Sequence, residues 1–328
     1  MHAGRRGELA RAASRNRLKG MAYYLGIDAG GTRTDCAIAR DETILYRASA
    51  PTIKILRVSG TQAERTLDEL LRQVADGAGV PLDAIAATCA GVSGVTVPRV
   101  AAWVKSALQS RVSGQILITG DEETALDGAF AGGPGVLAIA GTGSNFIARG
   151  EDGTLVRVGG WGILANEGSG MWIGQRAVRS IFDAVDRGET TLLLDAVLKA
   201  WKQADLTGLV DLSNQSPPVD YPTLSPVVAA CAARGDARAQ QILEDAGRQL
   251  AEYSMLAARR AAGTAASGKL APSFAFVGSV LARVPMVWEA MRAAILQEMP
   301  GATLATQPAD AVTGALWRAR HASLTHDR

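Results

Sequence analysis

The feature that most constrains the fold is a pattern that occurs twice in the chain. Residues 23–49 contain an apolar strand, a turn at Gly30-Gly31 and two further strands. The same order returns at residues 136–160, where the turn is Gly141-Thr142-Gly143. Two glycine turns in the same strand context predict a duplicated α/β domain.

Alternating helices and strands follow the first three strands. By apolar periodicity we predict helices at 61–76, 97–109 and 122–130, and strands at 84–92 and 115–119. The part after the second pattern is mainly helical, with helices predicted at 167–186, 191–204, 223–234, 236–262 and 310–322 and one strand at 273–280.

The Gly-Gly-Pro-Gly break at 132–135 separates the two patterns. We therefore predict an N-terminal domain at 21–133 and a C-terminal domain at 134–328, with the last helix as a candidate to pack back on the N-terminal domain. Residues 1–20 are rich in arginine and lack the apolar core of a signal peptide. They are predicted to be a disordered or non-native extension, and a transit or nucleic-acid-binding arm is the alternative.

Composition excludes several classes of protein. The net charge of +2 does not favour a nucleic-acid surface, and we find no apolar run near the roughly 20 residues of a membrane helix. Three widely spaced cysteines favour a reduced, cytoplasmic setting over a disulfide framework. All three histidines lie near the ends of the chain, so a general acid or base is expected to be a carboxylate.

The first glycine turn does not have the spacing of a dinucleotide site. That site needs Gly-x-Gly-x-x-Gly before a helix, whereas here a strand follows, and the Gly-Lys-Ser/Thr ending of a phosphate loop is absent too. The remaining interpretation is a hairpin turn whose backbone N–H groups and threonine hydroxyls bind phosphate.

Five motifs then occur in a fixed order: GIDAGGTRTD, ITGDEETALDGAF, IAGTGSNF, GGWGILANEGSGMWIG and FVGSV. Together, between about residues 23 and 317, they closely resemble the N-acetylglucosamine kinase-like members of the BadF/BadG/BcrA/BcrD ATPase family. The resemblance implies two actin-like ATPase (ribonuclease H-like) α/β domains with a nucleotide cleft between them. It also implies ATP and Mg²⁺ as cofactors, a small-molecule sugar as substrate, and allows a homodimer.

The resemblance also implies roles for individual residues. Asp121 matches the catalytic base, and Asp28 matches the acid that orients Mg²⁺ through water. The residues that match ATP phosphate contacts are Gly30, Gly31, Thr32, Arg33, Gly141, Thr142 and Gly143. Those that match adenosine contacts are Ala246, Gly247, Gly278 and Ser279. Those that match sugar contacts are Ser144, Asn145, Gly160, Trp161, Gly162, Asn166 and Glu167.

Several of these residues have a purely structural alternative. Asp121 could be a helix N-cap, a role that Asp often takes, and Ala246-Gly247 could serve helix packing. Glu122 and Glu123 are expected to cover the solvent side of the helix that begins there.

The sugar end departs from the pattern at two places. Relatives with amino-sugar activity usually carry Asp-Glu where this chain has Asn166-Glu167, and a charged hydrogen bond is roughly twice as strong as a neutral one. The loop at 48–60 lacks the asparagine of N-acetylglucosamine kinases. Lys54 in that loop could meet an anionic group of the substrate, or it could be a solvated surface lysine.

The expected activity is phosphorylation of a hexosamine, N-acetylglucosamine or glucosamine, at O6. Two alternatives remain open. One is an ATPase that activates a 2-hydroxyacyl-CoA dehydratase or benzoyl-CoA reductase through a shared iron–sulfur cluster. The other is a non-catalytic sugar-sensing protein.

Overall fold

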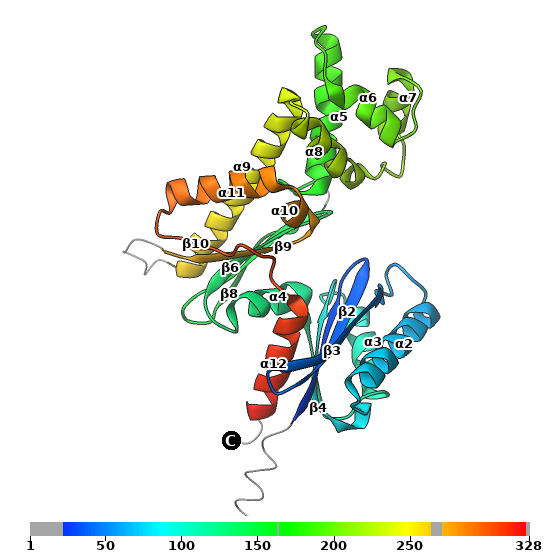
Figure 1. The fold of residues 1–328 in the computed structure, drawn as a ribbon, viewed down its shortest axis with the longest axis vertical. Helices are drawn as coiled ribbons and strands as arrows, with labels where there is room; N and C mark the ends of the chain where they lie inside the picture. The colour runs from blue at the N-terminus through cyan, green and yellow to red at the C-terminus, as the bar shows by residue number, and fades with distance from the viewer. Residues whose placement is uncertain (1–21, 163, 264–270, 326–328) are drawn as a thin grey trace, which may run out of the picture. The chain divides into compact units, whose positions relative to one another are not determined.

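The computed structural model describes residues 22–162, 164–263 and 271–325, and the predicted extension at 1–20 lies outside them (Figure 1). The chain divides into two compact units. Unit 1 comprises residues up to Ala131 together with those from Asp310 onward, and unit 2 comprises Gly132–Ala309. Within the described residues, no helix is long and apolar enough to cross a membrane.

Unit 1 contains a five-stranded mixed sheet with the order β3-β2-β1-β4-β5. The strands are β1 (Tyr23–Ala29), β2 (Arg33–Arg40), β3 (Thr43–Pro51), β4 (Ile85–Val92) and β5 (Gln115–Gly120). The first three are antiparallel, and β1, β4 and β5 run parallel to one another. The carboxyl ends of β1, β4 and β5 therefore meet at one edge of the sheet.

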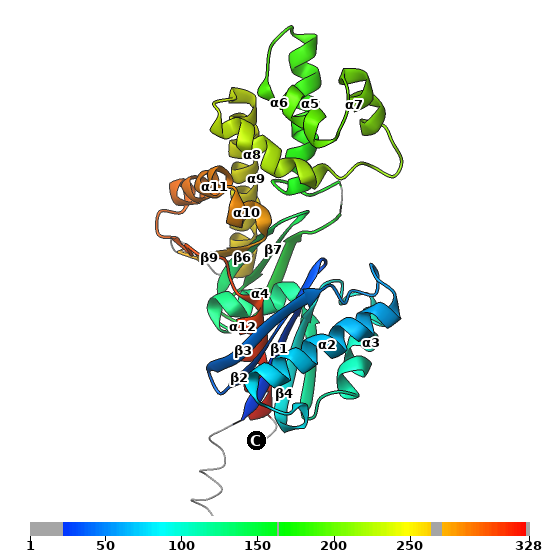
Figure 2. The same cartoon turned by 45° about the vertical axis from the view of Figure 1, so that its right-hand side comes forward.

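Helices cover both faces of this sheet (Figures 1 and 2). Helices α2 (Gly60–Ala78) and α3 (Pro98–Gln109) cover one face, where Leu25 and Ile27 of β1 are buried. Helices α4 (Asp121–Phe130) and α12 (Ala311–Thr325) lie on the other face. Residues of β1 alternate between these faces, because successive side chains of a strand point to opposite sides.

The packing of α12 depends on glycines. A Cβ added at Gly314 would lie 1.8 Å from the carbonyl oxygen of Thr124 in α4, and one added at Gly26 would lie 2.7 Å from Leu316. Backbone thus meets backbone where α12 crosses α4. This close approach brings residues that are nearly 200 positions apart in sequence into one unit.

Unit 2 repeats the same sheet. Its order is β8-β7-β6-β9-β10, with the first three strands antiparallel and β6, β9 and β10 parallel. The strands are β6 (Gly135–Ala140), β7 (Ser144–Arg149), β8 (Leu155–Gly159), β9 (Ser273–Val277) and β10 (Thr303–Leu304). The predicted fold class, two ribonuclease H-like α/β domains, is confirmed.

Unit 2 carries more helices than the sequence patterns predicted. The predicted ones are α5 (Gly170–Asp186), α6 (Leu192–Ala200), α8 (Ser225–Ala233) and α9 (Ala237–Ala262). The helices that were not predicted are α7 (Leu206–Ser213), the short α10 (Ser279–Arg283) and α11 (Pro285–Glu298). The last of these matters for the core, because α11 packs along α9 and buries Val287, Met291 and Ile295.

Candidate active site

Asp28 lies near the carboxyl end of β1 on the face covered by α4 and α12. It is paired in register with Asp35 of β2, and cross-strand partners point to the same face. Burial, and then the nearby carboxylates Asp121, Asp35 and Asp310, raise the pKa of Asp28 to about 7. A carboxylate in this position gains from any cation that binds beside it.

Asp35 is a member of this group to which the sequence motifs gave no role. Its carboxylate accepts hydrogen bonds from the Arg33 guanidinium, at 2.8 Å, and from the Ser49 hydroxyl. Arg33 therefore pairs with its own strand while its side chain stays 66% exposed. The signal that could have revealed Asp35 is its spacing, because the four-residue turn at 30–33 places it opposite Asp28.

The first glycine turn, residues 30–33, is held by the loop that follows β3. The hydroxyl of Thr52 donates to the Gly30 carbonyl at 2.9 Å, and the Ile53 N–H donates to the Thr34 hydroxyl at 3.2 Å. Thr32 is exposed. The turn is thus fixed in shape while its outer surface stays open to a ligand.

Asp121 is the first residue of α4, and Gly120 is the N-cap. Its carboxylate accepts a hydrogen bond from the Glu122 N–H at 3.1 Å. Burial and the neighbouring Glu122 raise the pKa of Asp121 to about 6. Gly120 is thus the N-cap residue, although the Asp121 carboxylate does accept from a first-turn N–H, and a carboxylate with a pKa near neutrality is suited to proton transfer.

Strand register brings Asp28 and Asp121 to the same edge. Asp28 is paired with Gly91 of β4, which is paired with Thr119 of β5, so Asp121 follows two residues beyond that level. Gly91 has to be a glycine, because an added Cβ would lie 2.2 Å from the Thr124 hydroxyl of α4. The α4 helix is therefore seated directly against the strand between the two acids.

The expectation that Glu123 covers the solvent side of α4 is wrong. Its side chain is 18% exposed and forms an ion pair of 3.1 Å with Arg318 of α12. Arg318 also pairs with the fully buried carboxylate of Asp127 and donates to the Thr119 hydroxyl at 3.1 Å. One arginine thus contacts residues on both sides of Asp121.

The acidic group fits a magnesium ion that is held mainly by water and phosphate. Among the described residues, no three histidine, cysteine or acidic side chains are close enough to hold a metal by themselves. Mg²⁺ usually keeps several waters and takes only one or two carboxylates from the protein. Asp28 offers an oxygen donor of that kind, so the chemistry of the donor set matches the predicted water-mediated role.

The second glycine turn, Gly141–Gly143, joins β6 to β7 in unit 2. The first N–H groups of α5 hold it: Gly170 donates to the Gly141 carbonyl at 2.8 Å, and Met171 donates to the Thr142 carbonyl at 3.1 Å. Gly170 is itself restricted, since an added Cβ would lie 3.0 Å from that same Gly141 oxygen. This turn too is fixed by backbone contacts.

Asn166 lies against the second glycine turn and forms a hydrogen bond with the backbone beside it. Its Oδ1 accepts a hydrogen bond from the Ser144 N–H at 3.3 Å, and an added Cβ on Gly143 would lie 2.7 Å from the same oxygen. The Nδ2 amide of the same side chain lies 3.9 Å from that added Cβ. Asn166, which stands where relatives with amino-sugar activity usually carry aspartate, therefore also holds the backbone of the second glycine turn.

The predicted sugar-contacting loop has an unusual backbone. Gly159, Gly160 and Gly162 all have positive φ, and the side chain of Trp161 between them is 85% exposed. Gly160 lies against the side chain of Asn145 in β7. Ser144 is buried, whereas Asn145 and Glu167 are half-buried.

A cavity of about 590 Å³ adjoins the second turn. It is lined by Gly141, Thr142 and Ser279 from the predicted nucleotide contacts and by Thr223 and Arg283, which sequence reasoning missed. Gly278 starts α10 at φ 102°, where an added Cβ would lie 2.3 Å from the Ala140 carbonyl oxygen. No local pattern marks the 220–226 segment that forms the other wall.

The structure does not bring Ala246 and Gly247 to this cavity lining. Gly247 is packed under α11, where an added Cβ would lie 2.5 Å from the Val287 carbonyl oxygen. Ala246 is fully buried, and its carbonyl oxygen meets the tight turn at Gly168. The packing alternative accounts for both small residues, and their contact with adenosine stays a prediction.

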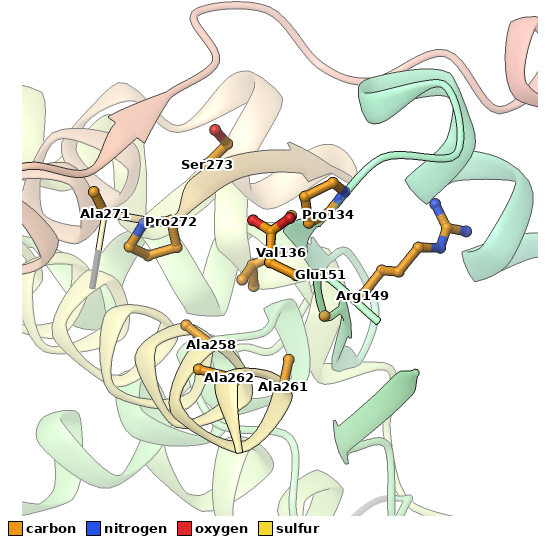
Figure 3. Close-up of a pocket in the computed structure, with 12 residues that line it drawn as sticks. Pro134, Val136, Arg149, Glu151, Ala258, Ala261, Ala262, Ala271, Pro272 and Ser273 are labelled. Atoms are coloured by element: carbon orange, nitrogen blue, oxygen red, sulfur yellow. The ribbon is translucent and has the colours of Figure 1, made fainter. Parts of the chain in front are cut away.

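A second, smaller cavity of about 180 Å³ lies at the opposite ends of the same strands (Figure 3). Pro134 and Val136 at the start of β6, Pro272 and Ser273 at the start of β9, and alanines of α9 line it. Ligands of α/β sheets bind outside the carboxyl ends of the strands. This cavity at the amino ends is therefore separate from the candidate site.

The cysteines do not favour a shared iron–sulfur cluster. Cys36, Cys89 and Cys231 are all buried and unbridged. Burial raises the pKa of Cys89 to about 12 and that of Cys36 further. A cluster ligand has to be a thiolate, which these two sites oppose.

We expect Asp28→Asn to stabilise the protein at alkaline pH. A folded-state pKa raised above the unfolded value means that stability is lost as pH rises from about 4 to about 7. A difference of about 3 between the two pKa values corresponds to at most about 4 kcal/mol. The melting temperature, measured without nucleotide and with EDTA, should be higher in the variant at pH 8 and nearly equal at pH 4.

The exposed Asp83→Asn variant is the matched control and should change little at either pH. An unchanged difference between Asp28→Asn and the parent protein from pH 4 to pH 8 would contradict the raised pKa.

Comparison with known proteins agrees with this geometry. Glucosamine kinase GspK of Vibrio cholerae serotype O1 is 27% identical over 226 residues, which cover 68% of this chain and 76% of that protein. A candidate N-acetylglucosamine kinase of Chromobacterium violaceum has a solved structure with a TM-score of 0.68 and 26% identity, over 90% of this chain and 98% of that one. The ROK hexokinase of Thermus thermophilus shares the fold, with a TM-score of 0.59 at 17% identity over 93% of this chain and 100% of that one.

The family model that matches is that of the BadF/BadG/BcrA/BcrD ATPase family, over residues 25–317. This match contains both glycine turns, both acids at the edge of the first sheet, and the first half of α12. The chain therefore belongs to the BadF/BadG/BcrA/BcrD ATPase family.

Proposed function

We propose that this protein is an ATP-dependent sugar kinase that phosphorylates a hexosamine-type sugar at O6. The observation that carries the proposal is the pair of raised-pKa carboxylates, Asp28 and Asp121, at one edge of a sheet whose neighbouring turn is open to phosphate. Family membership and the likeness to a glucosamine kinase and a candidate N-acetylglucosamine kinase support it.

Asp121 is the proposed general base. Its carboxylate accepts the proton of the sugar hydroxyl as the hydroxyl oxygen forms a bond to the γ-phosphorus and the bond from that phosphorus to the β,γ-bridging oxygen breaks. A base with a pKa of about 6 is ionised at neutral pH and still basic enough to bind the proton.

The two glycine turns are the proposed phosphate contacts, through Gly30, Gly31 and Thr32 in unit 1 and Gly141, Thr142 and Gly143 in unit 2. Hydrogen bonds to the carbonyl groups of Gly30, Gly141 and Thr142 fix the backbone of both turns before the ligand arrives, so little reorganisation is needed to stabilise charge on the transferred group. Mg²⁺ bound through water beside Asp28 would neutralise part of the phosphate charge.

In unit 2, the proposed nucleotide and sugar contacts flank the second turn. The cavity with Ser279 and Gly141 in its lining is large enough for an adenosine group. Ser144, Asn145 and the Asn166 amide are the proposed partners of sugar hydroxyls, together with Glu167 and the loop around Trp161.

The test is release of ADP from ATP with purified protein and a panel of sugars. We expect release that depends on both Mg²⁺ and sugar, and highest turnover with an amino sugar, with phosphate found on O6 by NMR. ATP hydrolysis that is independent of every sugar, or no turnover at all, would overturn the proposal.

A further inference from the structure

Lys54 occupies a fixed position in the loop that follows β3. The Lys54 N–H donates to the Thr52 hydroxyl at 3.1 Å, and that hydroxyl in turn donates to the Gly30 carbonyl. Ile53, the preceding residue, is 2% exposed and belongs to the core of unit 1. The loop that positions Lys54 is therefore tied to both the core and the first glycine turn.

The side chain of Lys54 reaches the carboxyl end of β4. Its Nζ donates to the Ser93 hydroxyl at 3.1 Å, and the Ser93 N–H donates to the Ala29 carbonyl at 3.0 Å. Ser93 directly follows Val92, which is paired in register with Gly120. Ser93 and Asp121 thus directly follow two residues that are paired across the neighbouring strands β4 and β5.

The ammonium group of Lys54 has no carboxylate partner within the described part of the chain, although the side chain is half-buried. Arg33 and Arg47 differ in this respect, since Arg33 pairs with Asp35 and Arg47 pairs with Asp310. A half-buried charge that is satisfied only by a hydroxyl can still form a charge-assisted hydrogen bond. The missing partner is thus expected to come from a ligand.

The strand order shows where the Lys54 ammonium lies relative to the glycine turn and to Asp121. The phosphate-binding turn joins β1 to β2, whereas Ser93 follows β4 and Asp121 follows β5 in the order β2-β1-β4-β5. The Lys54 ammonium is anchored at the end of β4, which lies between β1, the strand that leads into the turn, and β5, the strand that leads to the base. A charge at this place is one strand away from Asp121, which puts it near the acceptor that the base deprotonates.

We propose that Lys54, positioned by Ser93, binds an anionic substituent of the sugar, so that the preferred acceptor is an amino sugar bearing a carboxylate or phosphate group. This inference rests on the proposed kinase function. The loop at 48–60 carries this lysine and no asparagine, so a charge and not an amide is available there.

The test compares kcat/KM for three acceptors that differ in charge: N-acetylglucosamine, its 3-O-lactyl derivative N-acetylmuramic acid, and N-acetylglucosamine 1-phosphate. We expect one of the two anionic sugars to be preferred over the neutral one. Lys54→Gln should lower kcat/KM for that sugar about 10- to 100-fold, as expected for the loss of a hydrogen bond to a charged group. It should leave the KM for ATP and the activity with N-acetylglucosamine nearly unchanged.

Lys105→Gln on the exposed side of α3 is the matched control and should leave all three values unchanged. Thermal-shift titration with each sugar in the absence of ATP gives a second readout that does not need turnover.

Equal losses of kcat/KM with all sugars in Lys54→Gln, together with a raised KM for ATP, would assign Lys54 to the nucleotide and overturn the inference. No preference for either anionic sugar would overturn it as well. Both results would leave the kinase proposal intact, whereas absence of ADP release with every sugar would contradict the kinase proposal itself.

Discussion

Asp121→Asn is expected to lower kcat about 10²- to 10⁴-fold, which is the usual contribution of a general base to proton transfer. Asparagine has nearly the same shape and can still accept the Glu122 N–H, but it cannot take a proton from the sugar. ATP binding should persist, because the glycine turns are held by Thr52 and by α5 and not by Asp121. Turnover is measured by ADP release, and ATP affinity by calorimetric titration.

The pH profile gives this prediction its control. In the parent protein kcat/KM should rise with pH up to about pH 6 and then level off, because the base must be ionised. Glu122→Gln removes a carboxylate that raises the pKa of Asp121, so the rising limb should move to lower pH while the plateau is kept. Near-normal turnover of Asp121→Asn, or a limb that does not move in Glu122→Gln, would remove Asp121 from the role of base.

The second large effect is expected for Arg318→Met. Methionine fills much of the same space but removes the guanidinium that pairs with Asp127, whose side chain is fully buried. Removing one partner of a buried ion pair costs about 3–5 kcal/mol. Urea denaturation should therefore show a loss of that size in the free energy of unfolding, and activity should fall because Thr119 and Glu123 on either side of Asp121 lose their common contact.

Two further variants test the cause. Arg72→Met removes exposed ion pairs on α2 and should cost less than about 1 kcal/mol. Arg318→Lys keeps the charge but not the planar fork that reaches several acceptors, so it should restore only part of the lost stability. If Arg318→Met is no less stable than Arg72→Met, the contacts with α4 are not what holds α12 in place.

The strands and turns could be predicted because their signals are local. An apolar run that ends at glycines marks a strand and a turn in residues 23–49, and the same signals in residues 136–160 revealed the duplication. Sheet order then follows, since three antiparallel strands and two parallel crossovers leave few arrangements. The position of Asp121 directly after a strand could also be predicted, because the apolar run of that strand is a local signal.

The contacts that were not predicted join residues far apart in the sequence. Asn166 reaches the backbone of Ser144 across a loop, and Arg318 reaches Asp127 from another segment altogether. Nothing in the neighbourhood of either residue specifies its partner. The missed helix α11 is different, because Pro285 at its first turn was a usable start signal.

The return of α12 to unit 1 has a consequence for how the protein is made on the ribosome. The face of the first sheet that contains Tyr24, Ala37, Ala87 and Cys89 is covered by Val312, Ala315, Leu316 and Ala319. Domains generally fold as units during synthesis, with the N-terminal one first. Here that order is reversed in part: all of unit 2 emerges from the exit tunnel before the residues that close unit 1. The nascent chain therefore carries a sheet face that α4 covers without α12 throughout the translation of residues 132–309, and we expect it to need protection by chaperones during that interval.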